Sequence, residues 1–411
     1  MAEAGRGAGG GLRTTWLSLV VTLAIQSMVS MALLTLPVMA PEVARALGRP
    51  TTYLGVYVAL AYLGAMASSL ASGAAVARLG AIRISQIGLV LCALGLALCA
   101  LPSAAAVAAG ALLIGLGYGP VTPASSHLLA RTTPPGRLSL VFSLKQTGVP
   151  LGGMLAGALV PGSVLLVGWQ GALLGVAAVS LLCAGVAQPL RAGLDADRDP
   201  QSPLALGHLA HPVRLVLSHR VLAMLALCSF FFSAIQVSLT TYLVIYLHEA
   251  LGFALVAAGL AMSVSQLAGV GGRIAWGYVS DRYLGARRTL ILLALLMVAS
   301  CVATAALSSA MPTALLMAVL VVFGASAIGW NGVYLAEVAR QAPAGMASLA
   351  TGGTLAITFL GVVLGPAAFG ALSGAAGSYR AGFAALALPA LLCGVLLWRQ
   401  GRQRAARPAT D

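Results

Sequence analysis

Long apolar runs recur along this 411-residue chain and constrain its fold more than any other feature. Each run has about 20 or more residues, enough for a helix to cross a hydrocarbon core of roughly 30 Å. Twelve of them fit between Trp16 and Trp398. Because 60% of the residues are hydrophobic and only 8% are charged, a soluble globular domain is excluded. The sequence therefore predicts an all-α membrane protein with twelve transmembrane helices.

A polar stretch rich in Asp, Pro and His separates the sixth run from the seventh and predicts a linker. The predicted spans cover residues 16–40, 52–77, 84–101, 104–129, 138–161, 164–188, 221–247, 255–280, 289–308, 313–337, 347–371 and 380–398. The domain organisation follows as an N-terminal tail, a six-helix bundle, a linker, a second six-helix bundle and a C-terminal tail, at residues 1–15, 16–188, 189–220, 221–398 and 399–411.

The basic residues orient the chain. With both termini inside, most of the 23 basic residues fall in cytoplasmic segments, as the positive-inside rule requires. We therefore expect a multi-pass protein of a bacterial inner membrane with both termini cytoplasmic. The net charge of +14 then reflects topology, and a nucleic-acid partner is disfavoured.

The two halves of the chain repeat each other. The segment from Gly73 to Gly80 after the second span corresponds to Gly277 to Gly285 after the eighth, where Ala77 stands in place of Asp281. With Arg282 and the basic pair that follows, the second copy resembles the loop signature of the major facilitator superfamily. The resemblance covers essentially the whole chain and implies two pseudo-symmetric six-helix bundles that work by alternating access.

The same signature predicts a conformational latch at the cytoplasmic face. Asp281 can cap a helix end and pair with nearby arginines. Glu337 lies at i, i+3 from Arg340 and can join this network. Its alternative role is to carry a proton, for which an acid paired with arginine is poorly suited. The predicted latch residues are Asp281, Arg282, Arg288, Glu337 and Arg340.

Lys145 is the one lysine of the chain, and it lies inside the fifth apolar run. An amine held in hydrocarbon costs roughly 2.5 to 3.5 kcal/mol even on insertion scales, so it needs an anion, water or a partner. Arg273 lies inside the eighth run, and both residues fall eight positions from the inner end of their spans. At 1.5 Å per residue, both lie about 12 Å into the membrane.

In the superfamily fold that the resemblance implies, the fifth and eighth helices face each other beside a central cavity. Two cations at one depth repel unless an anion lies between them. The segment Gly271-Gly-Arg273-Ile-Ala-Trp-Gly277 also resembles the eighth-span segment of oxalate/formate exchangers and monocarboxylate carriers. Two other motifs of those carriers, a first-span signature and an eleventh-span lysine, are absent. The alternative is that both cations snorkel or bond helix carbonyls.

Further polar residues lie on spans one, four, seven and ten, which line the cavity in this superfamily. The candidates are Gln26, Tyr118, Gln236, Asn331 and Tyr334. Each one alone is also explained as a helix-to-helix hydrogen bond. His127 is the candidate for proton coupling by residue type, with a structural partnership to Arg131 as the alternative.

These observations predict a secondary transporter for a small, monocarboxylate-like organic anion, driven by proton symport or by anion exchange. The partners are that anion, a proton and the lipid bilayer, and we expect a monomer without metal or other cofactor. A drug/proton antiporter or another small-solute exporter of the same superfamily is the alternative, although the first-half spans hold no interior carboxylate. A membrane sensor usually carries an added soluble domain. An enzyme is least expected, since no nucleophile, metal or phosphate-loop motif is present.

Overall fold

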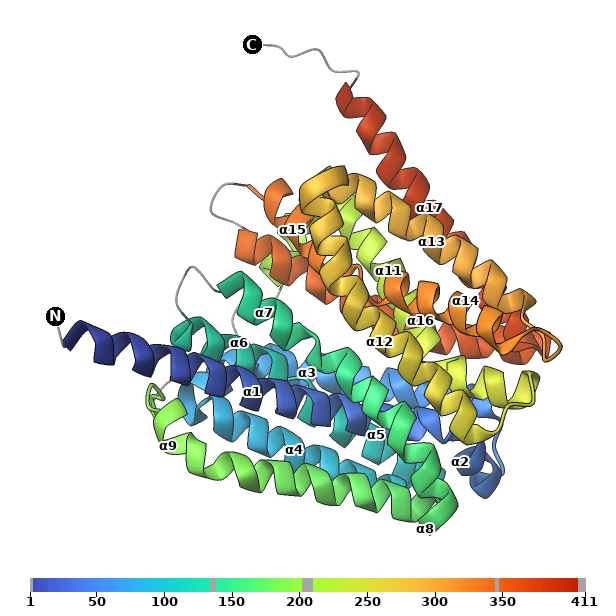
Figure 1. The fold of residues 1–411 in the computed structure, drawn as a ribbon, viewed down its shortest axis with the longest axis horizontal. Coiled ribbons are helices and arrows are strands. Elements are labelled where there is room, and N and C mark those ends of the chain that lie inside the picture. The colour runs from blue at the N-terminus through green and yellow to red at the C-terminus, as the bar shows by residue number, and fades with distance from the viewer. Residues whose placement is uncertain (1–2, 134–137, 202–209, 344–346, 406–411) are drawn as a thin grey trace. The chain divides into compact units, whose positions relative to one another are not determined.

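The described chain is helical, and its helices follow the predicted spans (Figure 1). The computed structural model describes residues 3–133, 138–201, 210–343 and 347–405. Up to the linker the helices are α1 (Glu3–Val38), α2 (Ala40–Leu47), η1 (Thr51–Tyr53), α3 (Leu54–Leu79), α4 (Ala81–Cys99), α5 (Ala104–Tyr118), α6 (Val121–Thr132), α7 (Leu138–Gln146), α8 (Gly148–Ala187), η3 (Gln188–Leu190) and α9 (Arg191–Leu194). After it come α10 (Ala210–Ser218), α11 (Arg220–Ile245), η4 (Tyr246–Ala250), α12 (Leu255–Val279), η5 (Ser280–Leu284), α13 (Ala286–Ala306), α14 (Thr313–Ala327), α15 (Asn331–Gln341), α16 (Ala347–Ala376) and α17 (Tyr379–Ala405).

In the described residues, eleven helical stretches are long and apolar enough to cross a membrane. One of them, Leu144–Leu194, contains both the fifth and the sixth predicted span. Inside α8, Gly168 leaves the helical conformation at φ 73° and ψ 171°, and two helices meet at this kink. Figure 1 shows that α8 turns back on itself. Only glycine adopts such a backbone without strain. The all-α membrane fold is confirmed, and this turn at Gly168 accounts for the twelfth crossing.

The chain divides into two compact units. In the first, α1 packs along α8, and α4 packs against α5 and α8. In the second, α11 packs along α16, α13 along α17 and α12 along α14. Figure 1 shows α4 beside the second part of α8, and α13 beside α17. The units are residues 1–50 with 60–207, and residues 51–59 with 208–411.

This division differs from the predicted bundles at one place, because residues 51–59 belong with the C-terminal half. The Thr51 hydroxyl donates to Glu249 Oε2 at 2.9 Å and contacts the Tyr379 hydroxyl. The Thr52 carbonyl accepts a hydrogen bond from Tyr242 at 3.0 Å. These hydrogen bonds therefore attach the start of the second span, residues 51–59, to the second unit. The pattern of apolar residues does not reveal this attachment.

Helical structure extends into the predicted tail and linker. The helix α1 begins at Glu3, within the stretch expected to be a tail. The predicted linker contains η3, α9 and α10, and its residues 202–209 lie outside the described part of the chain.

Glycines show that the two units share one packing scheme. A Cβ on Gly115 would lie 3.0 Å from Ala61 Cα, and one on Gly324 would lie 2.6 Å from Ser265 Oγ. Their partners are 204 residues apart, the same offset as Gly73 and Gly277 of the loop signature, and the two glycines are 209 apart, the same offset as Arg131 and Arg340. Small residues at such contacts let helix backbones approach closely. The internal repeat read from the sequence thus exists in the packing.

Spans four, five and ten are each interrupted near a candidate residue. In span four, Gly119 and Pro120 separate α5 from α6, and Pro120 and Pro123 each lack the N–H that a continuous helix needs. In span five, Pro150 prevents a helical bond to Gln146, the last residue of α7. In span ten, residues 328–330 form a turn between α14 and α15 although that span contains no proline.

Candidate functional site

Lys145 is buried in the first unit, with 1% of its surface exposed. It lies in the last turn of α7, where the helix ends because Pro150 follows. A cation in that position is favoured by the partial negative charge of the helix C-terminus. This local stabilisation explains part of how the chain tolerates an ammonium group here.

The face of α7 that carries Lys145 packs inside the bundle. One helical turn earlier, Val141 forms a buried apolar cluster with Leu19 of α1 and Leu129 of α6. Lys145 is four residues after Val141, so it extends from the same face of α7. Its ammonium therefore belongs to the bundle interior rather than to the lipid-facing surface.

Gln26 lies two helical turns beyond Leu19 on α1 and is fully buried. Its Oε1 accepts a hydrogen bond from the Thr122 hydroxyl at 3.0 Å, and its Nε2 donates to Ser30 at 3.4 Å. A Cβ on Gly148 would lie 2.9 Å from Gln26 Cβ, so the start of α8 packs directly on this side chain. The Gln26 amide therefore packs against Gly148, which follows Lys145 by three residues on the fifth span. The hydroxyls of Thr122 and Ser30 bond to that amide.

Tyr118 lies at the C-terminal end of α5, next to the interruption of span four. Its ring packs edge-on against Tyr62, with centroids 6.0 Å apart. The hydrogen bond to Gln26 comes from Thr122, which sequence reasoning did not select. A polar residue just after Pro120 was the signal that could have identified it.

A second amide cluster lies in the C-terminal unit. Gln236 of α11 accepts hydrogen bonds on its Oε1 from Trp330 Nε1 at 3.0 Å and from Asn331 Nδ2 at 3.4 Å. Because an indole N–H can only donate, the Gln236 amide must turn its oxygen, not its nitrogen, toward Trp330. Tyr334 is buried edge-on against Trp330, with centroids 5.2 Å apart. The structure therefore brings three predicted residues together and adds Trp330.

Arg273 lies beside the interruption of span ten. Its Nε donates to the carbonyl of Ile328 at 3.1 Å, and Trp276 Nε1 donates to the carbonyl of Ala325 at 2.9 Å. Ala325 lies in the last turn of α14 and Ile328 directly follows that helix, where backbone oxygens lack helical partners. Bonding to helix carbonyls was the alternative expected for Arg273, and the structure contains this bond.

The predicted latch residues are only partly assembled. Glu337 and Arg340 form an ion pair at 3.4 Å. Asp281, Arg282 and Arg288 are exposed, and in the part of the chain that the structure describes no ion pair involves Asp281. The latch around Asp281 therefore stays a prediction.

His127 lies on α6 and bonds Asp197 through Nε2 at 2.7 Å. Arg131, one turn later, forms an ion pair with the same carboxylate. Burial acts to raise the pKa of Asp197, but the His127 hydrogen bond and the Arg131 charge outweigh it and lower that pKa below its usual value. His127 and Arg131 are thus linked, as the structural alternative expected, but each of them pairs with Asp197, which sequence reasoning did not select. The sequence signal that could have identified it is the run of acids at every second position after the sixth span, Asp195, Asp197 and Asp199.

Comparison with known proteins identifies the family. A family model described as the Major Facilitator Superfamily matches residues 16–359. The chain belongs to the Major Facilitator Superfamily. The family expected from the loop signature is therefore confirmed, and the protein is a multi-pass membrane protein of that superfamily.

Two superfamily relatives from Mycobacterium tuberculosis, in strains CDC 1551 and H37Rv, are described as uncharacterized MFS-type transporters. Each is 25% identical over 288 residues, which cover 67% of this chain and 61% of the relative. The chain thus spans about three fifths of the length of these relatives.

Solved superfamily structures share the fold at low sequence identity. The nucleoside transporter NupG has a TM-score of 0.77 at 16% identity, covering 93% of this chain and 99% of its own. An inward-facing bacterial homologue of the human lysosomal transporter Spinster has a TM-score of 0.75 at 13% identity, covering 95% and 97%. A POT family transporter in complex with a peptide conjugate has a TM-score of 0.74 at 14% identity, covering 94% and 96%. At these identities the likeness concerns the fold alone.

Proposed function

We propose that the protein is a secondary transporter that moves a small, monocarboxylate-like organic anion by alternating access, with proton symport or anion exchange. The burial of Lys145 supports this proposal most directly. A cation inside a membrane-spanning bundle is costly, and such residues usually mark a substrate or ion pathway. Superfamily membership supports the transport activity, and the charge of Lys145 supports the class of substrate.

Lys145 and the polar groups of the Gln26 cluster suit a carboxylate. The ammonium supplies charge, and Gln26 and Thr122 supply an amide and a hydroxyl that bond to each other now and are able to bond a substrate oxygen. Arg273 is the proposed second cation. A guanidinium carries five N–H donors, so a bond to the Ile328 carbonyl and a contact with an anion are compatible.

The C-terminal candidates have a proposed supporting role. Because Trp330 and Asn331 donate to Gln236 Oε1, the Gln236 amide nitrogen is oriented away from them and is a donor for a substrate oxygen. Tyr334 packs against Trp330 and holds the indole in place. His127 is the proposed proton-coupling residue.

The test is uptake by proteoliposomes, with a panel of radiolabelled carboxylates and an imposed pH gradient. Lys145→Met removes the charge and keeps an unbranched side chain, whereas Lys145→Arg keeps the charge. A lost charge-assisted hydrogen bond costs about 1.5 to 3 kcal/mol, which predicts roughly a 10- to 100-fold weaker apparent affinity for the methionine variant. Arg49→Met, which removes an exposed charge, serves as the control and should transport normally.

Anion uptake that is unchanged in a well-folded Lys145→Met protein would contradict the substrate class. The double variant with Arg273→Met tests whether both cations contact one anion. In that case the two losses are not additive, and the double variant is little worse than Lys145→Met alone.

The alternative, a drug/proton antiporter or another small-solute exporter, predicts a different outcome of the same experiment. No carboxylate would be taken up, and a cationic or neutral compound would move against the proton gradient. His127→Asn separates the two modes of energy coupling. It abolishes pH-driven uptake if His127 carries the proton, and it leaves counterflow exchange intact.

A further inference from the structure

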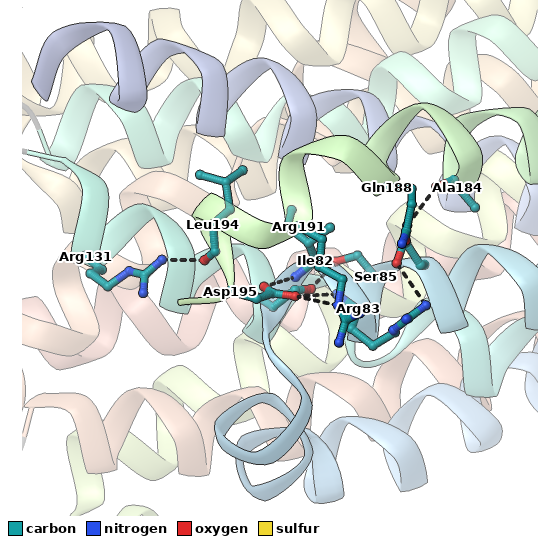
Figure 2. Close-up of polar contacts among 11 residues, drawn as sticks. Ile82, Arg83, Ser85, Arg131, Ala184, Gln188, Arg191, Leu194 and Asp195 are labelled. Carbon is teal, nitrogen blue, oxygen red and sulfur yellow. Dashed lines mark hydrogen bonds and ion pairs between the residues drawn. The ribbon is translucent and has the colours of Figure 1, made fainter. Parts of the chain in front are cut away.

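The segment that follows the sixth span, residues 194–199, lies against the inner ends of two helices of its own unit. We call it the strap. At its centre Asp195 is buried, with 3% of its surface exposed. Its two carboxylate oxygens accept hydrogen bonds from the backbone N–H groups of Ile82 at 2.8 Å and Arg83 at 3.0 Å (Figure 2). Asp195 thereby satisfies two N–H groups in the first turn of α4, which no helical carbonyl reaches.

The strap occupies the place of a missing acid. The loop before α4 is the first copy of the signature, in which Ala77 replaces the acid of the second copy. The carbonyl of Ala77 accepts a hydrogen bond from the Asp199 N–H at 2.8 Å. Gly80, with φ +95°, leaves room for the strap, because a Cβ there would lie 2.5 Å from Asp195 Cβ. An acid therefore reaches this loop from the end of span six.

Further contacts join the strap to α4 and its neighbours. Arg191 lies 3.7 Å from Asp195 at i, i+4 and partly balances the buried charge. Gln86 of α4 donates to the Ala184 carbonyl and to Gln188 Oε1, both at 2.9 Å, at the end of span six. The inner ends of spans three and six are thus held together by the Gln86 hydrogen bonds as well as by Asp195 of the strap.

The strap also binds the inner end of α6. Asp197 pairs with His127 and Arg131. Figure 2 shows that Arg131 also donates to the Leu194 carbonyl. The helix α6 has only 12 residues and is separated from α5 by Gly119 and Pro120. A helix this short owes its position mainly to tertiary contacts. Its opposite end carries Thr122, the hydrogen-bond partner of Gln26.

We propose that Asp195 and Asp197 are positioning residues: the strap supplies the acid absent at Ala77, holds the N-terminus of α4, and holds α6 so that Thr122 stays bonded to Gln26. The role at α4 is independent of the proposed transport function. The role at α6 rests on it only because Gln26 and Thr122 belong to the proposed substrate site.

Hydrogen exchange of the full chain in detergent micelles tests the role at α4. In Asp195→Ala, exchange of the Ile82 and Arg83 amides should rise roughly tenfold or more, since two buried N–H groups lose a charged acceptor. Asp199→Ala is the matched control, because it removes the same charge from the same strap and its side chain is exposed. If the alanine variant does not fold, Asp195→Asn keeps one acceptor oxygen and should show an intermediate effect. Unchanged exchange at both amides in either variant overturns the proposal.

Asp197→Asn tests the role at α6, with Asp197→Glu as the conservative variant. Exchange of the amides of residues 124–126, near the Thr122 end, should rise roughly twofold to fivefold in Asp197→Asn, because the pairs are partly exposed. Asp197→Glu should restore it. Exchange that rises only at residues 127–132 would show a local structural role and would overturn the positioning claim.

Transport kinetics give the readout that distinguishes this inference from the proposed function. With any carboxylate that the proteoliposome panel identifies, Asp197→Asn should raise KM several-fold while the maximal rate stays within about twofold. A lower maximal rate with unchanged KM contradicts a positioning role. If no carboxylate is transported, the proposed function fails, and the exchange experiments still decide whether the strap holds α4 and α6.

Discussion

Gly271 and Gly272 are adjacent glycines in α12, and they offer a matched test of how that helix packs. A Cβ on Gly271 meets nothing within 4 Å. A Cβ on Gly272 would lie 2.9 Å from Ala325 Cα on α14 and closer still to the Ala325 carbonyl oxygen, the acceptor of the Trp276 bond. We therefore expect Gly271→Ala to be tolerated and Gly272→Ala to push the two helices apart.

The magnitude follows from the geometry. Carbon atoms pack best at about 3.5 to 4.0 Å, so the added methyl group requires a shift of roughly 0.6 Å or more. Overpacking of this kind costs about 1 to 3 kcal/mol. Both variants gain about 1 kcal/mol of helix propensity over glycine, and this gain cancels in the comparison. Gly272→Ala should therefore be less stable than Gly271→Ala by about 1 to 3 kcal/mol.

A thiol-reactive fluorophore provides the assay, since the cysteines are reduced and all but Cys183 are buried, so unfolding exposes them. For a unit of about 200 residues, the expected difference in unfolding temperature is roughly 2 to 12 °C. Equal unfolding temperatures for the two variants would refute the close contact between α12 and α14. They would also refute the role of Trp276 and Arg273 in holding the end of α14.

Two further predictions concern the strap and the glycines with left-handed backbones. Gly80→Ala and Gly168→Ala both place a Cβ on a residue with positive φ and ψ above 150°, which costs about 1 to 3 kcal/mol, but only the Gly80 variant also meets the strap, so it should unfold at the lower temperature. The pKa of Asp197 lies below its usual value, so its stabilising contribution is complete above that value and is lost as the pH falls through the lowered one. The stability difference between the parent protein and Asp197→Asn should persist down to about pH 4 and vanish below it; a difference that vanishes near neutral pH would contradict this reasoning.

Much of the fold was predictable because it depends on local composition. Length and apolarity determine which segments cross the membrane, and the repeated loop at Gly277 indicates the duplicated bundle and the family. The sequence predicts a short break at residues 162–163 between spans five and six, whereas the turn lies at Gly168, inside the predicted sixth span. Assignment of residues 51–59 to the second unit was not predictable, because it depends on hydrogen bonds to Tyr242 and Glu249 far along the chain.

The polar residues of the candidate site could largely be selected from the sequence, whereas their hydrogen-bond partners could not. Lys145 and Gln26 stand out because polar groups are rare in apolar runs, and the structure places both in the bundle interior. Their neighbours were harder to identify. Thr122 and Trp330 have ordinary sequence contexts, and only the approach of α1 to α6 and of α11 to α15 makes them hydrogen-bond partners.

The interruptions of spans four and ten show what the sequence indicates by itself and what only the tertiary structure decides. Pro120 and Pro123 each remove a backbone N–H from span four, so the sequence itself marks a point at which helical hydrogen bonding is weakened. Span ten has no proline, and its turn at residues 328–330 is held by Arg273 and Trp276 from another helix. Sequence alone shows where a backbone donor is missing and helical bonding is weakened, whereas a break that depends on donors from a distant helix is decided only when tertiary structure brings those donors to the carbonyls.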